Sequence, residues 1–386
     1  MHSRGKTMMH NPRIIILTAS YGEGHIQAAS AIQQSLQRKG IDQVQVVDLI
    51  KLAHPLFHTV SSFLYTKSTT FAQLGIDYYG WLYHATRGIK PDGLCHRYFG
   101  RLGRFALSRE IERQRPDAVI STFPYGAATA VCRHLDIPNF TVVTDYTLHG
   151  IWLHRGVDKY YVACPELKEE LVFHGFPRGR IEVSGIPIRS AFEDLSRTDL
   201  ALNGNGMNND THTLLILAGS YMRKTLHQLI RTLTQLTNVQ LVVVCGRNKK
   251  AEHELRLAYA NQPRLSIFGY VENMDELMAD ASCIVTKAGG LTLSEAIALK
   301  KPIFIFQPYS GQEYENAKFL VRQKAAFCAG NVRELALQVS RVLSDESLTR
   351  EMKRTMAGLR KKAASDYIVH NIIEAIGATP ERAKTE

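Results

Sequence analysis

The sequence predicts an α/β protein with two parallel β-sheets, one in each half of the chain. Two observations carry this prediction: short apolar runs alternate with helical patterns along the 386 residues, and a polar segment interrupts the alternation near the middle. A chain of this length exceeds one ordinary hydrophobic core, which favours two domains. We place them at residues 8–195 and 196–365, followed by a C-terminal helix and polar tail at 366–386.

Each half supplies six candidate strands. In the first half they are Arg13–Ala19, Val44–Val47, Ala118–Ser121, Phe140–Val143, Lys159–Ala163 and Ile181–Ser184. In the second half they are Thr213–Leu217, Gln240–Cys245, Leu265–Phe268, Ser282–Thr286, Pro302–Phe306 and Ala325–Cys328. The glycine- and asparagine-rich segment Asn203–Asp210 is the expected linker or surface loop between the halves, and Leu348–Ile376 is a long, charged helical pattern.

Bulk composition limits the class of protein. With 45% hydrophobic and 22% charged residues the chain is typical of a globular protein, and no apolar run approaches the roughly 18 residues of a membrane span. The short run Ile14–Leu17 is predicted to be a first strand, not a signal peptide, because polar Thr18 and Ser20 end it. The six cysteines are scattered without a Cys-x-x-Cys pair, so we expect reduced thiols and a cytoplasmic protein.

The net charge of +11 indicates an anionic partner: a nucleotide, a nucleic acid or an acidic membrane surface. The excess of basic over acidic residues is concentrated in one part of the chain. Between Lys51 and Arg109 eight basic residues face two acidic ones, and aromatic residues are interleaved with them.

The glycine pair Gly289-Gly290 marks a candidate anion site. It lies between the end of a buried strand and a helix predicted over Thr292–Leu299. Adjacent glycines allow positive φ and let the backbone approach an anion closely, and the free N–H groups of a first helical turn bind phosphate. Glu295, one turn further in, suits a ribose diol better than a phosphate, so the motif favours a nucleotide. A glycine-rich turn with only a structural role is the alternative.

The first predicted strand leads into Gly22-Glu23-Gly24-His25, which holds a histidine at a helix N-terminus. The positive end of the helix lowers the pKa of such a histidine, and a neutral imidazole suits a general base. A capping or packing role for His25 is the alternative. Gln27 replaces the third glycine of a dinucleotide fingerprint, and no P-loop sequence exists, so neither an NAD site nor a P-loop ATPase is predicted.

Asp145 follows another strand and belongs to the same ligand-facing rim, where it is expected to orient His25 or to handle a sugar or acceptor hydroxyl. His149 and His154 lie close in sequence, but the spacing of these three residues matches no common zinc motif. We therefore predict no metal and expect structural hydrogen bonds from the two histidines.

Further candidate ligands follow other strands of the two sheets. Arg189 leaves the last strand of the first half, where it reaches a nucleotide or forms a surface ion pair. The backbone around Val271 can bind a base edge, and amide and carboxylate groups such as Gln312 and Glu313 suit sugar hydroxyls. The small-residue turn at Gly219 and Ser220 lies where ligands collect in doubly wound sheets.

Several motifs in this order resemble a known enzyme family. They are Leu17–His25, Ser121–Pro124, Val143–Tyr146, Asp158–Val162, Gly185–Arg189, Val243–Asn248, Thr286–Gly290 and Pro308–Glu313. Together they resemble the monogalactosyldiacylglycerol synthases and processive diacylglycerol β-glucosyltransferases, relatives of the peptidoglycan N-acetylglucosaminyltransferase. The resemblance spans roughly Ile14 to Lys361. Ala288 replaces a proline that is frequent in the family, and Glu23 replaces a neutral residue.

The resemblance implies a glycosyltransferase B-type fold, in which two Rossmann-like domains face each other across a cleft. It implies inverting, metal-independent transfer of a hexose, glucose in the first place, from a UDP-sugar to diacylglycerol or glycosyl-diacylglycerol, with no further cofactor. The implied roles are His25 as base, Val271 at uracil, Arg189, Gly219 and Ser220 at the nucleotide, Gly289, Gly290, Leu291 and Thr292 at the diphosphate, Glu295 at the ribose, and Gln312 and Glu313 at the hexose.

The family also gives the basic and aromatic stretch a role at an anionic membrane surface. If Leu94–Arg109 is helical, Leu94, Tyr98, Leu102 and Phe105 share one face, flanked by Arg97, Arg101 and Arg104. Rings and cations so arranged fit a peripheral protein on the inner face of the cell membrane, whereas a buried helix with a basic edge is the alternative. A soluble UDP-sugar epimerase and a transferase with another acceptor remain open, and a nucleic-acid-binding protein has no recognisable module here.

Overall fold

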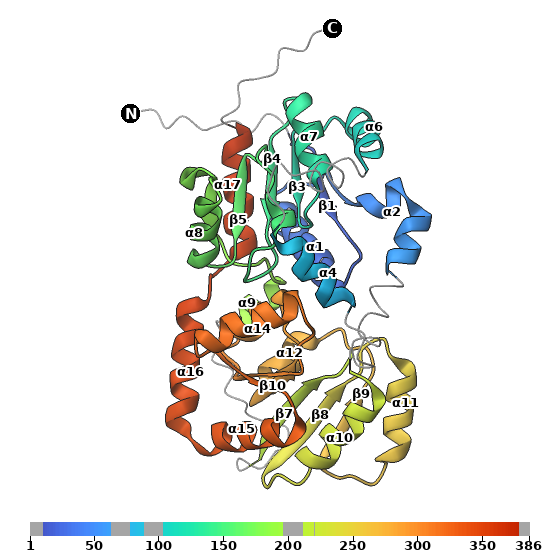
Figure 1. Ribbon diagram of the computed structural model, residues 1–386, viewed down its shortest axis with the longest axis vertical. Helices are drawn as coiled ribbons and strands as arrows, with labels where there is room; N and C mark the ends of the chain where they lie inside the picture. The colour runs from blue at the N-terminus through green and yellow to red at the C-terminus, as the bar shows by residue number, and fades with distance from the viewer. Residues whose placement is uncertain (1–10, 63–77, 89–102, 196–210, 220, 378–386) are drawn as a thin grey trace.

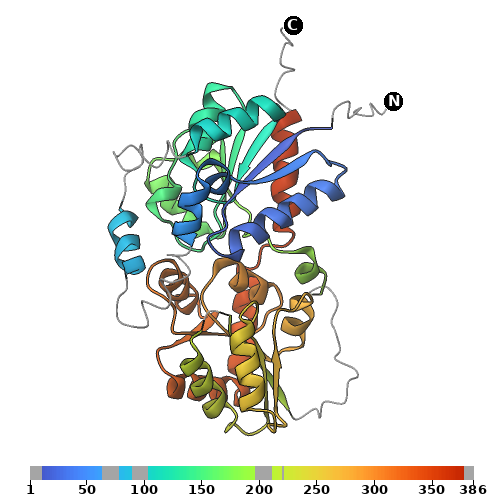
Figure 2. The same cartoon turned by 90° about the vertical axis from the view of Figure 1, so that its right-hand side faces the viewer.

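The computed structural model describes residues 11–62, 78–88, 103–195, 211–219 and 221–377. Figures 1 and 2 show two α/β lobes stacked along the long axis of the molecule. We call them the N-terminal lobe, built on strands β1 to β6, and the C-terminal lobe, built on β7 to β12. The predicted linker Asn203–Asp210 lies outside the described residues.

Both sheets are parallel and contain six strands. The N-terminal sheet has the order β2-β1-β3-β4-β5-β6, and the C-terminal sheet the order β12-β11-β10-β7-β8-β9. The strands are β1 Ile14–Thr18, β2 Val44–Asp48, β3 Ala118–Ser121, β4 Asn139–Val142, β5 Lys159–Val162, β6 Ile181–Val183, β7 His212–Leu217, β8 Val239–Val244, β9 Leu265–Phe268, β10 Cys283–Thr286, β11 Ile303–Phe306 and β12 Ala326–Ala329. The α/β class and all twelve predicted strands are confirmed, and every predicted strand end falls within one residue of the observed one.

Helices alternate with these strands. In the N-terminal lobe they are α1 Glu23–Arg38, α2 Leu49–Ala53, α4 Tyr78–Arg87, α6 Arg104–Gln114, α7 Gly126–His134, α8 Pro165–Phe173 and α9 Ser190–Leu195. In the C-terminal lobe they are α10 Arg223–Leu233, α11 Lys249–Ala258, α12 Met274–Asp280, α13 Gly290–Ala298, α14 Gln312–Arg322, α15 Val332–Ser344 and α16 Glu346–Leu359. The last helix of the chain, α17 Ala364–Gly377, belongs to the N-terminal lobe. Residues 55–62 are also helical.

The two faces of the N-terminal sheet are buried by different helices. Along β1, Ile14 and Ile16 join a cluster with α1 and α17, whereas Ile15 and Leu17 join a cluster that includes residues of α6 and α7. Side chains of a strand alternate between faces, so a strand covered on both sides is apolar at most positions. All five residues of β1 are buried, which explains why these strands stand out as continuous apolar runs.

The C-terminal helical pattern Leu348–Ile376 forms two helices, α16 and α17. The chain leaves α16 at Arg360 and turns at Ala363, whose φ is 52°. The N–H of Ala363 donates to the Glu193 carboxylate at 2.6 Å, which secures the turn. As a result α16 lies on the C-terminal lobe, and α17 returns to pack on α1 in the N-terminal lobe (Figure 1).

The predicted helix Leu94–Arg109 falls largely on residues 89–102, which lie outside the described residues. The described part begins after Gly103, and α6 continues five residues beyond Arg109 to Gln114. Among the described residues no helix is both long and apolar enough to cross a bilayer.

Candidate active site

The strand order brings two ligand-binding edges together. In a doubly wound sheet, ligands bind at the carboxyl ends of the strands where the order reverses. That point lies between β1 and β3 in the N-terminal sheet and between β7 and β10 in the C-terminal sheet. The helices that follow β1 and β10 are α1 and α13, and their first turns meet: a Cβ on Gly24 would lie 3.8 Å from that of Leu291. His25 and the Gly289-Gly290 turn therefore face one another across the lobes.

His25 is held in a single tautomer by the N-terminal lobe. Its Nδ1 lies 2.9 Å from the Thr122 carbonyl oxygen and 2.9 Å from the Thr144 hydroxyl. A carbonyl only accepts hydrogen bonds, so Nδ1 carries the proton and Nε2 carries the lone pair. Burial lowers the pKa of His25, although the charge of Asp145 and the bond to Thr122 oppose the shift. A neutral imidazole with a basic Nε2 has the form that a general base requires.

Asp145 binds the C-terminal lobe. Its Oδ1 accepts hydrogen bonds from the Gln312 side-chain amide and from Asn316 Nδ2, the latter at 3.2 Å. Burial raises the pKa of Asp145, and the neighbouring His25 and the two amides lower it. The described hydrogen bonds that orient His25 come from Thr122 and Thr144, so the influence of Asp145 on His25 is electrostatic.

Asn316 joins the two lobes at this point. It is fully buried, its Oδ1 accepts the Tyr146 N–H at 3.0 Å, and its Nδ2 also donates to the Ala288 carbonyl at 3.1 Å. The Tyr146 hydroxyl lies 2.9 Å from that of Ser294 on α13. These bonds fix Asp145 against the start of α13.

The Gly289-Gly290 turn differs from its prediction in one respect. Positive φ was expected, but Gly289 has a φ of −70° and Gly290 is the first residue of α13, which begins two residues earlier than predicted. Gly290 is required for another reason: a Cβ there would lie 2.2 Å from the Thr144 carbonyl oxygen of the other lobe. Glycine thus permits the lobes to meet. The first-turn N–H groups of α13, including those of Leu291 and Thr292, have no acceptor within the helix, which is the property that an anion site uses.

Three of the predicted nucleotide ligands lie together. Arg189 donates to the Glu272 carbonyl at 3.4 Å and lies 3.7 Å from the Asp275 carboxylate, which places it beside the loop that contains Val271. Glu295 is buried, and its carboxyl group interacts electrostatically with Arg189 and Asp275. Burial raises its pKa to about 8, while Arg189 lowers and Asp275 raises it.

The predicted hexose ligands Gln312 and Glu313 begin α14, beside Asp145 and the α13 turn. Gly311, which precedes them, has a φ of +88°, and a Cβ there would lie 2.9 Å from the Tyr83 ring of α4. Burial raises the pKa of Glu313, and Lys287 opposes that shift. Lys287, the residue after β10, is itself buried.

Other predicted residues have different outcomes. Gly219 is exposed at the end of β7, and Ser220 lies outside the described residues. Glu23 forms an ion pair with Arg247 at 3.3 Å, across the lobes. His149 is structural, as expected: its Nδ1 accepts the Ile151 N–H at 3.2 Å.

Sequence reasoning gave no role to Thr122, Thr144, Lys287 or Asn316. The first three lie in strand-exit motifs that it singled out, and Asn316 lies in α14, just beyond the motif Pro308–Glu313. For the first three, their position just after a strand was the sequence signal that could have identified them as site residues.

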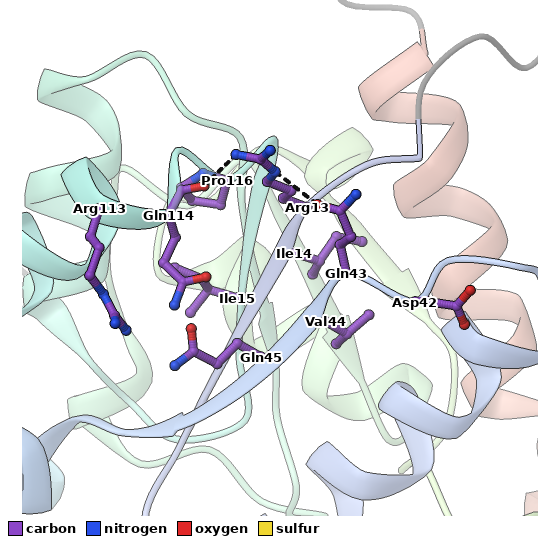
Figure 3. Close-up of a pocket in the computed structure, with 10 residues that line it drawn as sticks. All are labelled: Arg13, Ile14, Ile15, Asp42, Gln43, Val44, Gln45, Arg113, Gln114 and Pro116. Carbon is purple, nitrogen blue, oxygen red and sulfur yellow. Dashed lines mark hydrogen bonds between the residues drawn. The ribbon is translucent and has the colours of Figure 1, made fainter.

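Figure 3 shows a separate cavity of about 420 Å³ lined by Arg13, Gln43, Gln45 and Gln114. These residues lie at or before the amino ends of β1, β2 and β3, the edge opposite His25. The cavity therefore takes no part in the site.

Comparison with known proteins agrees with this arrangement. A family model described as monogalactosyldiacylglycerol (MGDG) synthase matches residues 25–188, and one described as glycosyltransferase family 28 C-terminal domain matches residues 213–370. A MurG crystal structure from Acinetobacter baumannii has a TM-score of 0.62 at 21% identity, covering 94% of this chain and 100% of that one. A Staphylococcus aureus MnaA structure with UDP has a TM-score of 0.61 at 15% identity, covering 96% and 98%.

The two matched models and the shared two-lobed architecture define a glycosyltransferase of the B-type fold. The processive diacylglycerol beta-glucosyltransferase of Bacillus thuringiensis (strain Al Hakam) is 36% identical to the chain over 371 residues, 95% of both proteins. Its counterpart in Bacillus cereus (strain AH187) is also 36% identical, over 95% of this chain and 94% of the relative. The chain belongs to the family of monogalactosyldiacylglycerol synthases and processive diacylglycerol beta-glucosyltransferases, and it is a glycolipid glycosyltransferase.

Proposed function

We propose that the protein transfers glucose from UDP-glucose to diacylglycerol, and then to the glucosyl product, with inversion at the anomeric carbon and without a metal ion. The observation that carries the proposal is the placement of His25 opposite the first turn of α13. One lobe supplies a base for the acceptor, and the other supplies donors for the leaving group. The glucose and diacylglycerol specificities are taken from the names of the relatives.

The chemistry follows from this geometry. His25 Nε2 takes the proton of the acceptor hydroxyl as its oxygen forms a bond to the anomeric carbon. The bond between that carbon and the diphosphate oxygen breaks on the opposite face, and its electron pair leaves with UDP. The N–H groups and the positive end of α13 stabilise the departing diphosphate, a role that a divalent cation plays in other enzymes. Attack opposite the leaving group inverts the configuration.

Exposed apolar side chains support a membrane-bound acceptor. On the described part of the N-terminal lobe, Leu56, Phe57 and Val60 in the helical residues 55–62 are 85%, 52% and 58% exposed. Trp81 of α4 and Phe105 of α6 are 73% and 88% exposed. Large exposed apolar side chains near basic residues are typical of proteins that bind the surface of an anionic bilayer. A location on the inner face of the cell membrane is part of this proposal.

The test uses anionic liposomes that contain diacylglycerol, each UDP-hexose in turn, and identification of the lipid products. His25→Ala should abolish glucosyl-lipid formation while UDP still binds, because the base is lost and the C-terminal lobe is intact. His134→Ala, at the exposed end of α7, is the matched control and should retain activity. Full activity of His25→Ala would refute the assignment.

The same reaction mixture without lipid tests the alternative of a soluble epimerase. The proposal predicts that UDP-glucose then stays unchanged apart from slow hydrolysis. Appearance of an epimeric UDP-sugar without any acceptor would favour the epimerase instead.

A further inference from the structure

Lys287 is a buried cation that the proposed mechanism does not use. It is 6% exposed and lies between β10 and the glycine turn. A buried lysine is costly unless its ammonium group has partners, so its surroundings indicate what it does.

Residues that follow β11 and β7, the two strands flanking β10, surround its ammonium group. Lys287 Nζ donates to the Gln307 carbonyl after β11. It also lies 3.8 Å from the centre of the Tyr309 ring and 4.7 Å from that of Tyr221, which follows β7. Cation–π contacts of this kind hold a lysine at a fixed point and direct its charge.

Tyr309 connects this lysine to a predicted hexose ligand. Its ring forms a cation–π contact with Lys287, and its backbone N–H donates to Glu313 Oε2 at 3.0 Å. The charges of Lys287 and Glu313 are coupled: burial raises the pKa of Glu313, and Lys287 lowers it. Burial lowers the pKa of Lys287 to about 8, and Glu313 raises it. Each group therefore favours the charged form of the other.

We propose that Lys287 is a positioning residue for the sugar half of the donor: it holds Glu313 in place through Tyr309 and favours its charged form, so that this carboxyl group accepts hydrogen bonds from the hexose hydroxyls. The inference rests on the proposed function, since it takes a UDP-hexose as donor. In the proposed function the uridine and diphosphate half is bound by other residues, so Lys287 is expected to act on the hexose contribution alone.

Lys287→Met tests this, because methionine has a similar unbranched length and suits a site between two rings. The dissociation constants of UDP and UDP-glucose are measured separately by calorimetry. We expect UDP binding to change less than about 2-fold and UDP-glucose binding to weaken roughly 10- to 100-fold, the size of a lost hydrogen bond to a charged group. Lys318→Met, an exposed lysine of α14, is the matched control and should change neither.

A double-mutant cycle separates this role from a general structural one. In a Glu313→Gln background, Lys287→Met should weaken UDP-glucose binding by less than about 2-fold, since no carboxylate remains to be positioned. Lys287→Arg should restore part of the loss by restoring the charge. Equal losses for UDP and UDP-glucose, or effects that multiply fully in the double variant, would overturn the proposal.

The wild-type protein distinguishes the two levels of inference. If it binds neither UDP nor UDP-glucose, the proposed function fails. If it binds both and Lys287→Met binds UDP-glucose normally, only the inference about Lys287 fails.

Discussion

Replacing Glu295 by glutamine should stabilise the protein, and the gain should grow with pH. Glu295 is 7% exposed on α13, and burial raises the pKa of its carboxyl from 4.5 to about 8. Arg189 opposes the shift and Asp275 adds to it. The folded protein therefore holds a proton at neutral pH that the unfolded chain releases.

The magnitude follows from proton linkage. Because the folded pKa is raised, the stability that the proton provides is complete below pH 4.5 and is lost as pH rises through 8. The resulting cost to folding is about 2 kcal/mol at pH 6 and about 4 to 5 kcal/mol at pH 8.5. A neutral glutamine does not carry this cost, so the gain from Glu295→Gln should increase by about 2 to 3 kcal/mol between these pH values.

The assay is urea unfolding of the nucleotide-free protein at pH 6.0 and 8.5, followed by circular dichroism. The matched control is Glu112→Gln, which replaces an exposed carboxylate of α6. It should change the free energy of unfolding by less than about 0.5 kcal/mol at both pH values. An equal gain for Glu295→Gln at the two pH values, or a loss of stability at pH 8.5, would show that the buried carboxyl is not the source.

Two further substitutions test how the lobes meet. Gly290→Ala should lower the melting temperature and the rate of glucosyl transfer, because its Cβ would lie 2.2 Å from the Thr144 carbonyl oxygen. The control is Gly289→Ala, whose Cβ would meet nothing within 4 Å. Equal melting temperatures of the two variants would contradict the contact. Asn316→Ala should cost about 3 kcal/mol or more in the free energy of unfolding, measured by urea titration, since it leaves buried groups of both lobes without partners; a loss below about 1 kcal/mol would contradict this role.

The positions of the strands were predictable because of their burial. Parallel strands covered by helices on both faces are mostly apolar, so a run such as Ile14–Leu17 is visible in the sequence. Ligand-binding residues lie just beyond such runs, which is why His25, Asp145 and the Gly289-Gly290 turn could be singled out.

The helical regions were less predictable. Nothing in the periodicity of Leu348–Ile376 marks the break at Ala363, because both helices are amphipathic and the turn is secured by Glu193, 170 residues away in sequence. The reason for Gly290 was also missed. A glycine pair predicts local backbone freedom, whereas the structure requires room for the backbone of another lobe.

The sequence by itself determined the two-sheet α/β class, the twelve strands and, through its motifs, the family. Tertiary structure decided how the site residues combine. Asp145 contacts Gln312 and Asn316, 167 and 171 residues away, and Lys287 and Glu313 come together through Tyr309. Strand patterns arise from burial within one sheet, and the apolar residues of each strand show that burial in the sequence. Contacts between lobes depend on how the folded surfaces of the two lobes fit together, and the residues of one segment do not show that fit.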